Sequence, residues 1–213
     1  MALALIALSL HAQKKPKTAM AMKPEQAAAV ENAEKDFIPA QQPCQNYGWA
    51  ALVEVLLKQQ KVAIPQKNWV MKAYGGYKCI SPVRDYTALQ RFIDGDYALG
   101  TAVKGSRTPN DLRKIRVETE FIPGAPSAAD AYIVRFREGQ PVMLIWNGHP
   151  YLWYGLVYDE YVHSNGSRMF EMRELKLLDP LAKSKKEQVV TFVKGKDDPA
   201  QINGVMVLRV TAR

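Results

Sequence analysis

The chain has 213 residues, of which 47% are hydrophobic and 23% are charged. This length and composition indicate one globular domain, or at most a small pair, and exclude repeat arrays, collagen-like chains and wholly disordered proteins. The formal net charge is +8. The basic excess includes two lysine clusters, which are Lys14, Lys15, Lys17 and Lys23, and then Lys183, Lys185 and Lys186. Neither cluster is interleaved with the aromatic residues on which nucleic-acid bases stack, so we expect no nucleic-acid partner.

The N-terminal residues predict export. Residues 1–10 (MALALIALSL) have the length and apolar character of the central region of a secretory signal peptide, so we expect residues 1–12 to be a signal peptide cleaved near Ala12. The alternative is an apolar N-terminus of a cytosolic protein. Residues 13–36 are expected to form a Lys/Ala-rich linker and an N-terminal helix, with the helix over residues 24–36.

Export has two consequences for the rest of the chain. A secreted or periplasmic location would place the two cysteines, Cys44 and Cys79, in an oxidising compartment. No uninterrupted apolar run reaches the roughly 18 to 20 residues that a membrane-spanning helix needs, so we expect no stable membrane anchor.

The first half of the chain has helical patterns. Residues 46–61 (NYGWAALVEVLLKQQK) place large apolar residues at helical spacing and contain no proline, which predicts a long, buried central helix. Shorter helices are expected over residues 66–74, directly after Pro65, and over residues 85–93.

The second half favours strands. Residues 115–122 alternate between apolar and polar, and residues 129–137 can form a short helix that ends at Gly139. Four further segments have strand patterns, which are residues 141–146, 151–158, 170–178 and 204–210. Asn147-Gly148 separates two of them and is typical of a tight turn. Helices followed by an antiparallel sheet indicate the α+β class.

Three segments in this order resemble a known family. Residues 42–51 (QPCQNYGWAA) precede the long helix, His149 follows a buried strand, and Leu178-Asp179-Pro180 follows a later strand. This order is similar to that of the papain-like cysteine peptidases, above all their bacterial effector-type and bacteriocin-leader-processing branches. The resemblance implies that residues 37–213 form a papain-like domain, with a helical N-terminal part packed on a C-terminal antiparallel sheet and a cleft between them.

The resemblance also implies roles for individual residues. Gln42 matches the glutamine of the oxyanion hole, His149 the general base, and Asp179 the residue that orients the base. The family's nucleophilic cysteine caps the N-terminus of the buried helix, where the helix dipole lowers the pKa of its thiol. That position, directly before Trp49, is occupied by Gly48. Without the order of these three segments along the chain, His149 and Asp179 would be interpreted as ordinary turn residues.

A glycine at the nucleophile position removes thiol chemistry there, because glycine has no side chain to form a thiolate or an acyl-enzyme. The remaining thiols leave three interpretations open. The family often has a disulfide from just before the nucleophile to a later segment, which implies a bridge between Cys44 and Cys79. Alternatively, the two thiols are free or buried, or Cys44 is a displaced nucleophile.

Aromatic residues surround His149 in the sequence. Trp146 and Tyr151 flank it, and Trp49 follows Gly48, so these three residues are candidates for binding an extended peptide in the cleft. The alternative for such aromatic residues is simple core and sheet packing. His163 is expected at an exposed hairpin tip.

Other site classes have little support in the sequence. The histidines and cysteines are scattered without paired spacing, so we expect no metal site, and we expect no cofactor because no phosphate-binding glycine loop is present. The sequence therefore predicts an exported, catalytically inactive papain-like protein with a peptide-binding cleft. The alternatives are an active cysteine peptidase that uses Cys44 with His149 and Asp179, and a purely structural or interaction domain.

Overall fold

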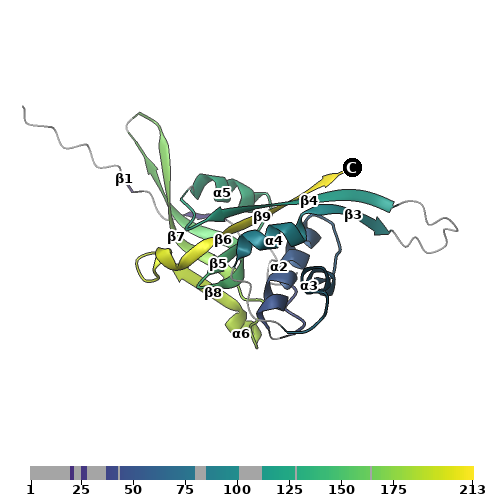
Figure 1. The fold of residues 1–213 in the computed structure, drawn as a ribbon. Coiled ribbons are helices and arrows are strands. Elements are labelled where there is room, and N and C mark those ends of the chain that lie inside the picture. Colours follow the sequence, from purple (N-terminus) through teal and green to yellow (C-terminus); the bar gives the residue numbers. More distant parts are fainter. Residues whose placement is uncertain are drawn as a thin grey trace, which may run out of the picture.

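The computed structural model describes residues 20–21, 25–27, 37–42, 44–79, 85–100, 112–127, 129–163 and 165–213. Within them, helices dominate the first half and strands the second (Figure 1), which confirms the predicted α+β class. The helices are α2 (Gln45–Gln59), α3 (Gln66–Tyr74), α4 (Tyr86–Ile93), α5 (Ala129–Arg137) and α6 (Lys185–Gln188), with a 3-10 turn η1 (Pro199–Gln201). No helix in these ranges is long and apolar enough to cross a membrane.

One antiparallel sheet contains all the strands of the described residues, with the central order β3-β4-β9-β5-β6-β7-β8. Their bounds are β3 (Gly95–Gly100), β4 (Leu112–Pro123), β5 (Val142–Trp146), β6 (His149–Val162), β7 (Arg168–Leu178), β8 (Val189–Val193) and β9 (Ile202–Ala212). Two short strands, β1 (Met20–Ala21) and β2 (Glu25–Ala27), pair with β6 outside this order.

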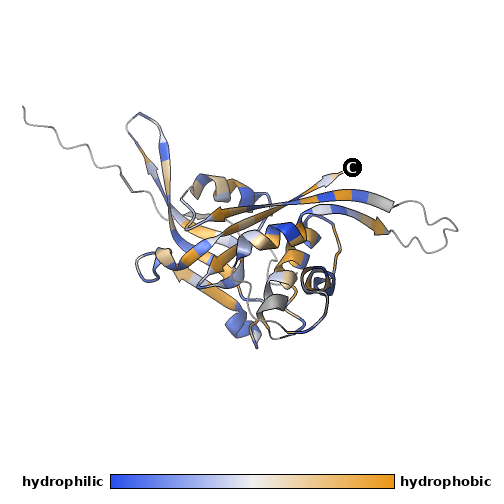
Figure 2. Ribbon diagram, viewed as in Figure 1, coloured by the Kyte–Doolittle hydropathy of each residue, from blue (hydrophilic) through white to orange (hydrophobic). Residues whose placement is uncertain are grey.

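The sheet is buried on both faces, with α2, α3 and α4 on one face and α5 on the other (Figure 1). Alternate residues of β5 point into the two layers, because Met143 packs with the α2 side and Leu144 packs with the α5 side. A central strand that is covered on both faces needs apolar residues at consecutive positions. This explains the uninterrupted apolar run of β5 and the hydrophobic colour of the central strands in Figure 2.

The four helices predicted after residue 45 are confirmed, with shifts of at most two residues at their ends. The helix α3 covers the predicted residues 66–74, and α4 begins after Asp85, whose side chain accepts hydrogen bonds from the backbone N–H groups of Thr87 and Ala88. The central helix α2 is buried as expected. It begins at Gln45, one residue before its predicted start, and its N-cap is Cys44.

The predicted turn at Asn147-Gly148 is confirmed. Both residues have positive φ, 52° and 71°, as the type I′ turn of a two-residue hairpin requires. The turn joins β5 to β6 and places Trp146 opposite His149. A second hairpin joins β6 to β7 as a long ribbon that projects from the body of the sheet (Figure 1), with His163 exposed at its tip as predicted.

The predicted helix over residues 24–36 is wrong at its start, because Glu25–Ala27 form strand β2. The cause lies in β6, which continues to Val162 although its partner β5 pairs with it only as far as Trp153. Beyond Trp153, β5 leaves the backbone groups on that edge of β6 without a partner strand. The short strands β2 and β1 take this place, because they pair with residues 156–158 and 161–162. The remainder of this helix and the predicted signal peptide lie outside the described residues.

Gly204 is closely packed in the sheet, where β9 lies between β4 and β5. A Cβ atom at this position would lie 2.5 Å from the ring of Phe121 and 2.6 Å from the carbonyl oxygen of Ile122. We expect Gly204→Ala to lower the free energy of unfolding by about 1–3 kcal/mol, because the Ile122 carbonyl belongs to a paired strand and cannot move freely. Denaturant unfolding measures this change. Gly76→Ala, where a Cβ would meet nothing within 4 Å, is the matched control, and an equal effect of both variants would contradict the packing argument.

Candidate functional site

The structure brings two of the predicted site residues into contact, His149 and Asp179. His149 is the first residue of β6, and Asp179 directly follows the last residue of β7. Because β6 and β7 are antiparallel, with Leu152 opposite Leu178, the start of one strand lies beside the end of the other. His149 Nε2 and Asp179 Oδ1 are 2.8 Å apart. The two side chains are only 18% and 22% exposed, so the pair is partly shielded from water.

The backbone around Asp179 holds its carboxylate in position. The N–H of Leu181 donates to Asp179 Oδ1 at 2.8 Å, and the N–H of Asp179 donates to the carbonyl of Gln188. The next residue, Pro180, accepts a hydrogen bond from the N–H of Ala40. A carboxylate fixed in this way orients the imidazole through Nε2. Nδ1 of His149 has no hydrogen-bond partner among the described residues and is the ring nitrogen left for a ligand.

Gly48 does not cap the N-terminus of α2. It is the fourth residue of the helix, and its N–H donates to the carbonyl of Cys44, which is the N-cap. A Cβ atom on Gly48 would have three atoms of the Leu181 side chain as its nearest neighbours, at 3.4–3.6 Å. Leu181 therefore lies over Gly48 while its own N–H binds Asp179.

The aromatic residues beside His149 and the helix that carries Gly48 belong to different core clusters. Trp146 and Tyr151 pack on the α5 side of the sheet, and the ring of His149 lies 4.5 Å from the ring of Tyr151. The helix α2, which carries Gly48, packs on the opposite side. Leu181, three residues after the end of β7, has its side chain at Gly48 and its N–H on Asp179, which is the partner of His149.

The implied disulfide is confirmed, because Cys44 and Cys79 are bonded, with their Cα atoms 5.7 Å apart. Gln42 lies against this bridge, with its Oε1 3.2 Å from the sulfur of Cys79. Its amide Nε2 is within 3.4 Å of the Tyr47 hydroxyl and of the Tyr77 carbonyl. Gln42 is thus placed beside Cys44 at the start of α2, and its hydrogen bonds to described residues are all in this region.

The three candidate peptide-binding aromatic residues have different environments. Trp49 is 1% exposed, packs in the core and donates from Nε1 to the Tyr74 hydroxyl, so it does not line a surface and its predicted role is wrong. Tyr151 and Trp146 are half-buried beside His149, with their ring centres 6.0 Å apart. Burial and the nearby negative charge of Asp179 raise the pKa of Tyr151 to about 12. The buried Nε1 of Trp146 has no hydrogen-bond partner among the described residues.

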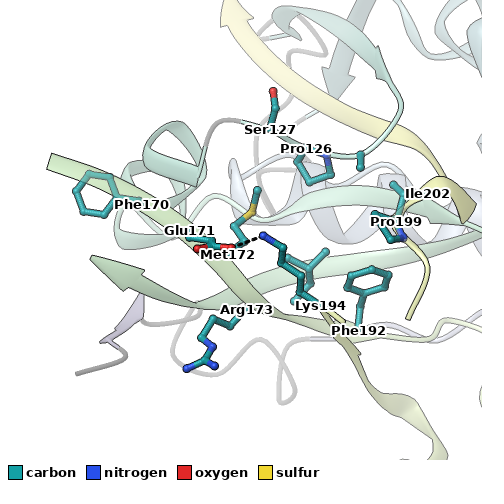
Figure 3. A pocket seen from close by; sticks show the side chains of 12 residues that line it. Pro126, Ser127, Phe170, Glu171, Met172, Arg173, Phe192, Lys194, Pro199 and Ile202 are labelled. Atoms are coloured by element: carbon teal, nitrogen blue, oxygen red, sulfur yellow. Dashed lines mark hydrogen bonds and ion pairs between the residues drawn. The ribbon is translucent and has the colours of Figure 1, made fainter. Parts of the chain in front are cut away.

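A pocket of about 270 Å³ lies on the α5 side of the sheet, and one of its lining residues, Phe192, packs on Trp146 with ring centres 5.3 Å apart. Figure 3 shows it between β7, β8 and the loop that precedes α5. Its lining residues are Ala125, Pro126, Ser127, Phe170, Glu171, Met172, Arg173, Leu175, Phe192, Lys194, Pro199 and Ile202. Strand β8, which carries Phe192 of this pocket, was not among the strands predicted from the sequence. The run VVTFV of β8 was the available signal, since β-branched and aromatic residues favour strands.

Within the described ranges, no group of three or more histidine, cysteine, aspartate or glutamate side chains could hold a metal ion. Comparison with known proteins adds no family, because no family model, no curated protein and no solved structure matches the chain.

Proposed function

We propose that this chain is an exported, non-catalytic protein with the papain-like cysteine peptidase fold, which binds an extended peptide beside His149 and Asp179. The disulfide supports export, because such bridges persist in oxidising compartments. The order of a buried helix, then a histidine at the start of one strand and an aspartate after the next strand, supports the fold.

The observation that carries the proposal is a positioned histidine–carboxylate pair without a nucleophile. His149 and Asp179 are hydrogen-bonded, as a general base and its orienting group would be. Gly48 has no side chain, and the sulfur of Cys44 is bonded to Cys79. Acyl transfer needs a nucleophile next to the base, so this arrangement favours binding over hydrolysis.

Half-exposed aromatic rings beside a polar group suit a peptide ligand. Tyr151 and Trp146 offer apolar surface, and Nδ1 of His149 offers a hydrogen-bonding atom that no described residue uses. Binding sites in proteins commonly combine aromatic walls with a few such polar groups. A peptide lying along these residues would contact His149 without being cleaved.

Peptide binding is the first test. A fluorescently labelled library of unstructured peptides would be measured by anisotropy against the purified chain and against His149→Ala. We expect the variant to weaken binding about tenfold, because a hydrogen bond and an aromatic contact are lost. His163→Ala, at the exposed tip of the ribbon, is the matched control. Equal affinities of His149→Ala and the unaltered protein would refute binding at this site.

Restoring a thiol is the second test. The variant Gly48→Cys combined with Leu181→Ala provides a thiol and removes the side chain that covers position 48. We expect a peptidyl epoxide to label this double variant in a manner that depends on His149, while Leu181→Ala alone stays unlabelled. A folded double variant that resists labelling would favour a purely structural domain without peptidase machinery.

A second candidate is a cysteine peptidase that is activated by reduction. It is favoured by the position of Cys44 as the N-cap of α2, where the helix dipole would lower the pKa of a free thiol. This candidate requires peptide hydrolysis that appears only after the disulfide is reduced and that Cys44→Ser and His149→Ala both abolish. Hydrolysis that survives Cys44→Ser would eliminate it.

A further inference from the structure

The outer edge of β8 has backbone groups without partners among the described residues. β8 is the last strand in the sheet order and pairs with β7 on one side only. The N–H of Lys194, directly after β8, donates to the carbonyl of Arg173 in β7, so the residues at odd positions of β8 direct their backbone groups away from β7. At Val193 these groups are satisfied by the turn that follows, since its N–H donates to Asp197 Oδ2. For Thr191, no described residue supplies such a partner.

The pocket opens beside this same strand. Phe192 of β8 forms part of its buried floor together with Leu175 and Ile202, and Met172 and Pro126 form its walls (Figure 3). The charges at its rim are already paired, because Lys194 reaches across to Glu171 and Arg173 binds Asp159. Most of the other lining side chains are apolar, so the interior of the pocket is apolar. A sealed cavity of about 150 Å³ can bind benzene, so a pocket of about 270 Å³ has room for one leucine or phenylalanine side chain.

A cluster of positive charge lies at the other end of β8. Lys183, Lys185 and Lys186 lie in α6 and just before it, and α6 leads directly into β8. All three side chains are exposed, and none forms an ion pair with a described residue. In Figure 2, α6 has the hydrophilic colour throughout. A ligand at this end of the strand would bind more tightly if it carried negative charge.

We propose that β8 is a docking edge for an extended acidic peptide, which adds a strand beside Val189 and Thr191, inserts one apolar side chain into the pocket and places acidic residues near the α6 lysines. Strand addition supplies main-chain hydrogen bonds, and pockets for alternate side chains supply selectivity. A residue opposite Phe192 on an added strand has its side chain on the same sheet face as the pocket. This docking does not depend on the function proposed above, which concerns His149 and Asp179.

The test uses a fluorescent peptide of eight residues, blocked at both ends, in which leucine and threonine alternate and three glutamates stand at one end. A second version has the glutamates at the other end, to cover both strand directions. We expect one version to bind, and we expect Thr191→Pro to weaken it about tenfold, since proline removes the outward N–H while the hydrogen bonds to β7 remain. Thr191→Val keeps the N–H and is the matched control.

Two further variants change only exposed positions and therefore keep the fold. Ser127→Trp at the pocket rim should weaken binding about tenfold by filling the pocket, and so should replacing leucine by serine in the peptide. Replacing Lys183, Lys185 and Lys186 together by glutamine should also weaken it about tenfold and reduce its dependence on salt.

The outcomes separate this inference from the function proposed above. Failure of both peptide versions to bind, or binding that Ser127→Trp and Thr191→Pro leave unchanged, overturns docking at β8. Binding that falls with these variants and is unaffected by His149→Ala supports docking at β8 independently of the His149 site. Slower hydrogen exchange of the Thr191 amide on peptide binding would support strand addition directly.

Discussion

Replacing Cys44 and Cys79 together by serine is expected to lower the free energy of unfolding by about 3–4 kcal/mol. The bridge closes a loop between residues 35 positions apart, and the chain-entropy model assigns this stabilisation to a loop of that length. The loop contains α2 and α3, so the lost constraint concerns the helices that cover one face of the sheet. Equilibrium denaturation of the double variant and of the oxidised chain measures the difference.

Local hydrogen bonds should survive the loss of the bridge. The hydroxyl of Tyr47 donates to the Tyr77 carbonyl, so the start of α2 and the segment before Cys79 stay connected. The reduced, unaltered chain is the control, because it should match the double variant in stability. An oxidised chain that is no more stable than the double variant would contradict a constraining bridge. The double variant has no thiol, so any thiol-dependent hydrolysis must disappear with it.

The helices and the central strands followed from local patterns in the sequence. Helix α3 after Pro65 and the turn at Asn147-Gly148 depend on neighbouring residues alone, and the structure places both as predicted. The apolar run of β5 was recognisable because a strand covered on both faces has no polar alternation. Such signals do not depend on how distant segments are arranged.

Pairing between distant segments was not predictable in the same way. The strand β2 replaces the start of an expected helix because it pairs with the edge of β6 that β5 leaves free. The residues Glu25–Ala27 alone do not indicate how long β6 is. The same holds for Trp49, whose position next to a candidate nucleophile suggested a binding role. Its side chain is in the core because of the direction in which α2 presents it.

The candidate site was predictable in part for a similar reason. The contact between His149 and Asp179 follows from antiparallel pairing of the strands that carry them. The face of the sheet to which a histidine at the start of a strand points depends on the twist of the strand and on the pairing register. The placement of Leu181 over Gly48 is a packing result of this kind.

Raising the pH from 10 to 12 is expected to unfold the protein progressively. Burial raises the pKa values of Tyr86, Tyr97 and Tyr151 to about 12, with further contributions from Tyr74, Asp94 and Asp179 respectively. In the unfolded chain these phenols ionise near pH 10. Their contribution to stability is therefore complete below pH 10, and it is lost as the pH rises toward the folded-state values, because the unfolded chain releases protons first.

The hydrogen bonds of the phenols give this transition a structural cause. The hydroxyl of Tyr86 donates to the Gly148 carbonyl, beside the His149 turn, and the hydroxyl of Tyr97 donates to the Ile93 carbonyl. Phenolates cannot donate, so ionisation would leave both carbonyls facing a negative charge. Denaturant unfolding at a series of pH values, with phenolate absorbance recorded in parallel, should show a smaller loss of stability above pH 10 in Tyr86→Phe than in the unaltered chain. Tyr77→Phe, at an exposed position, is the control, and an alkaline transition that is the same in both variants would contradict the role of Tyr86.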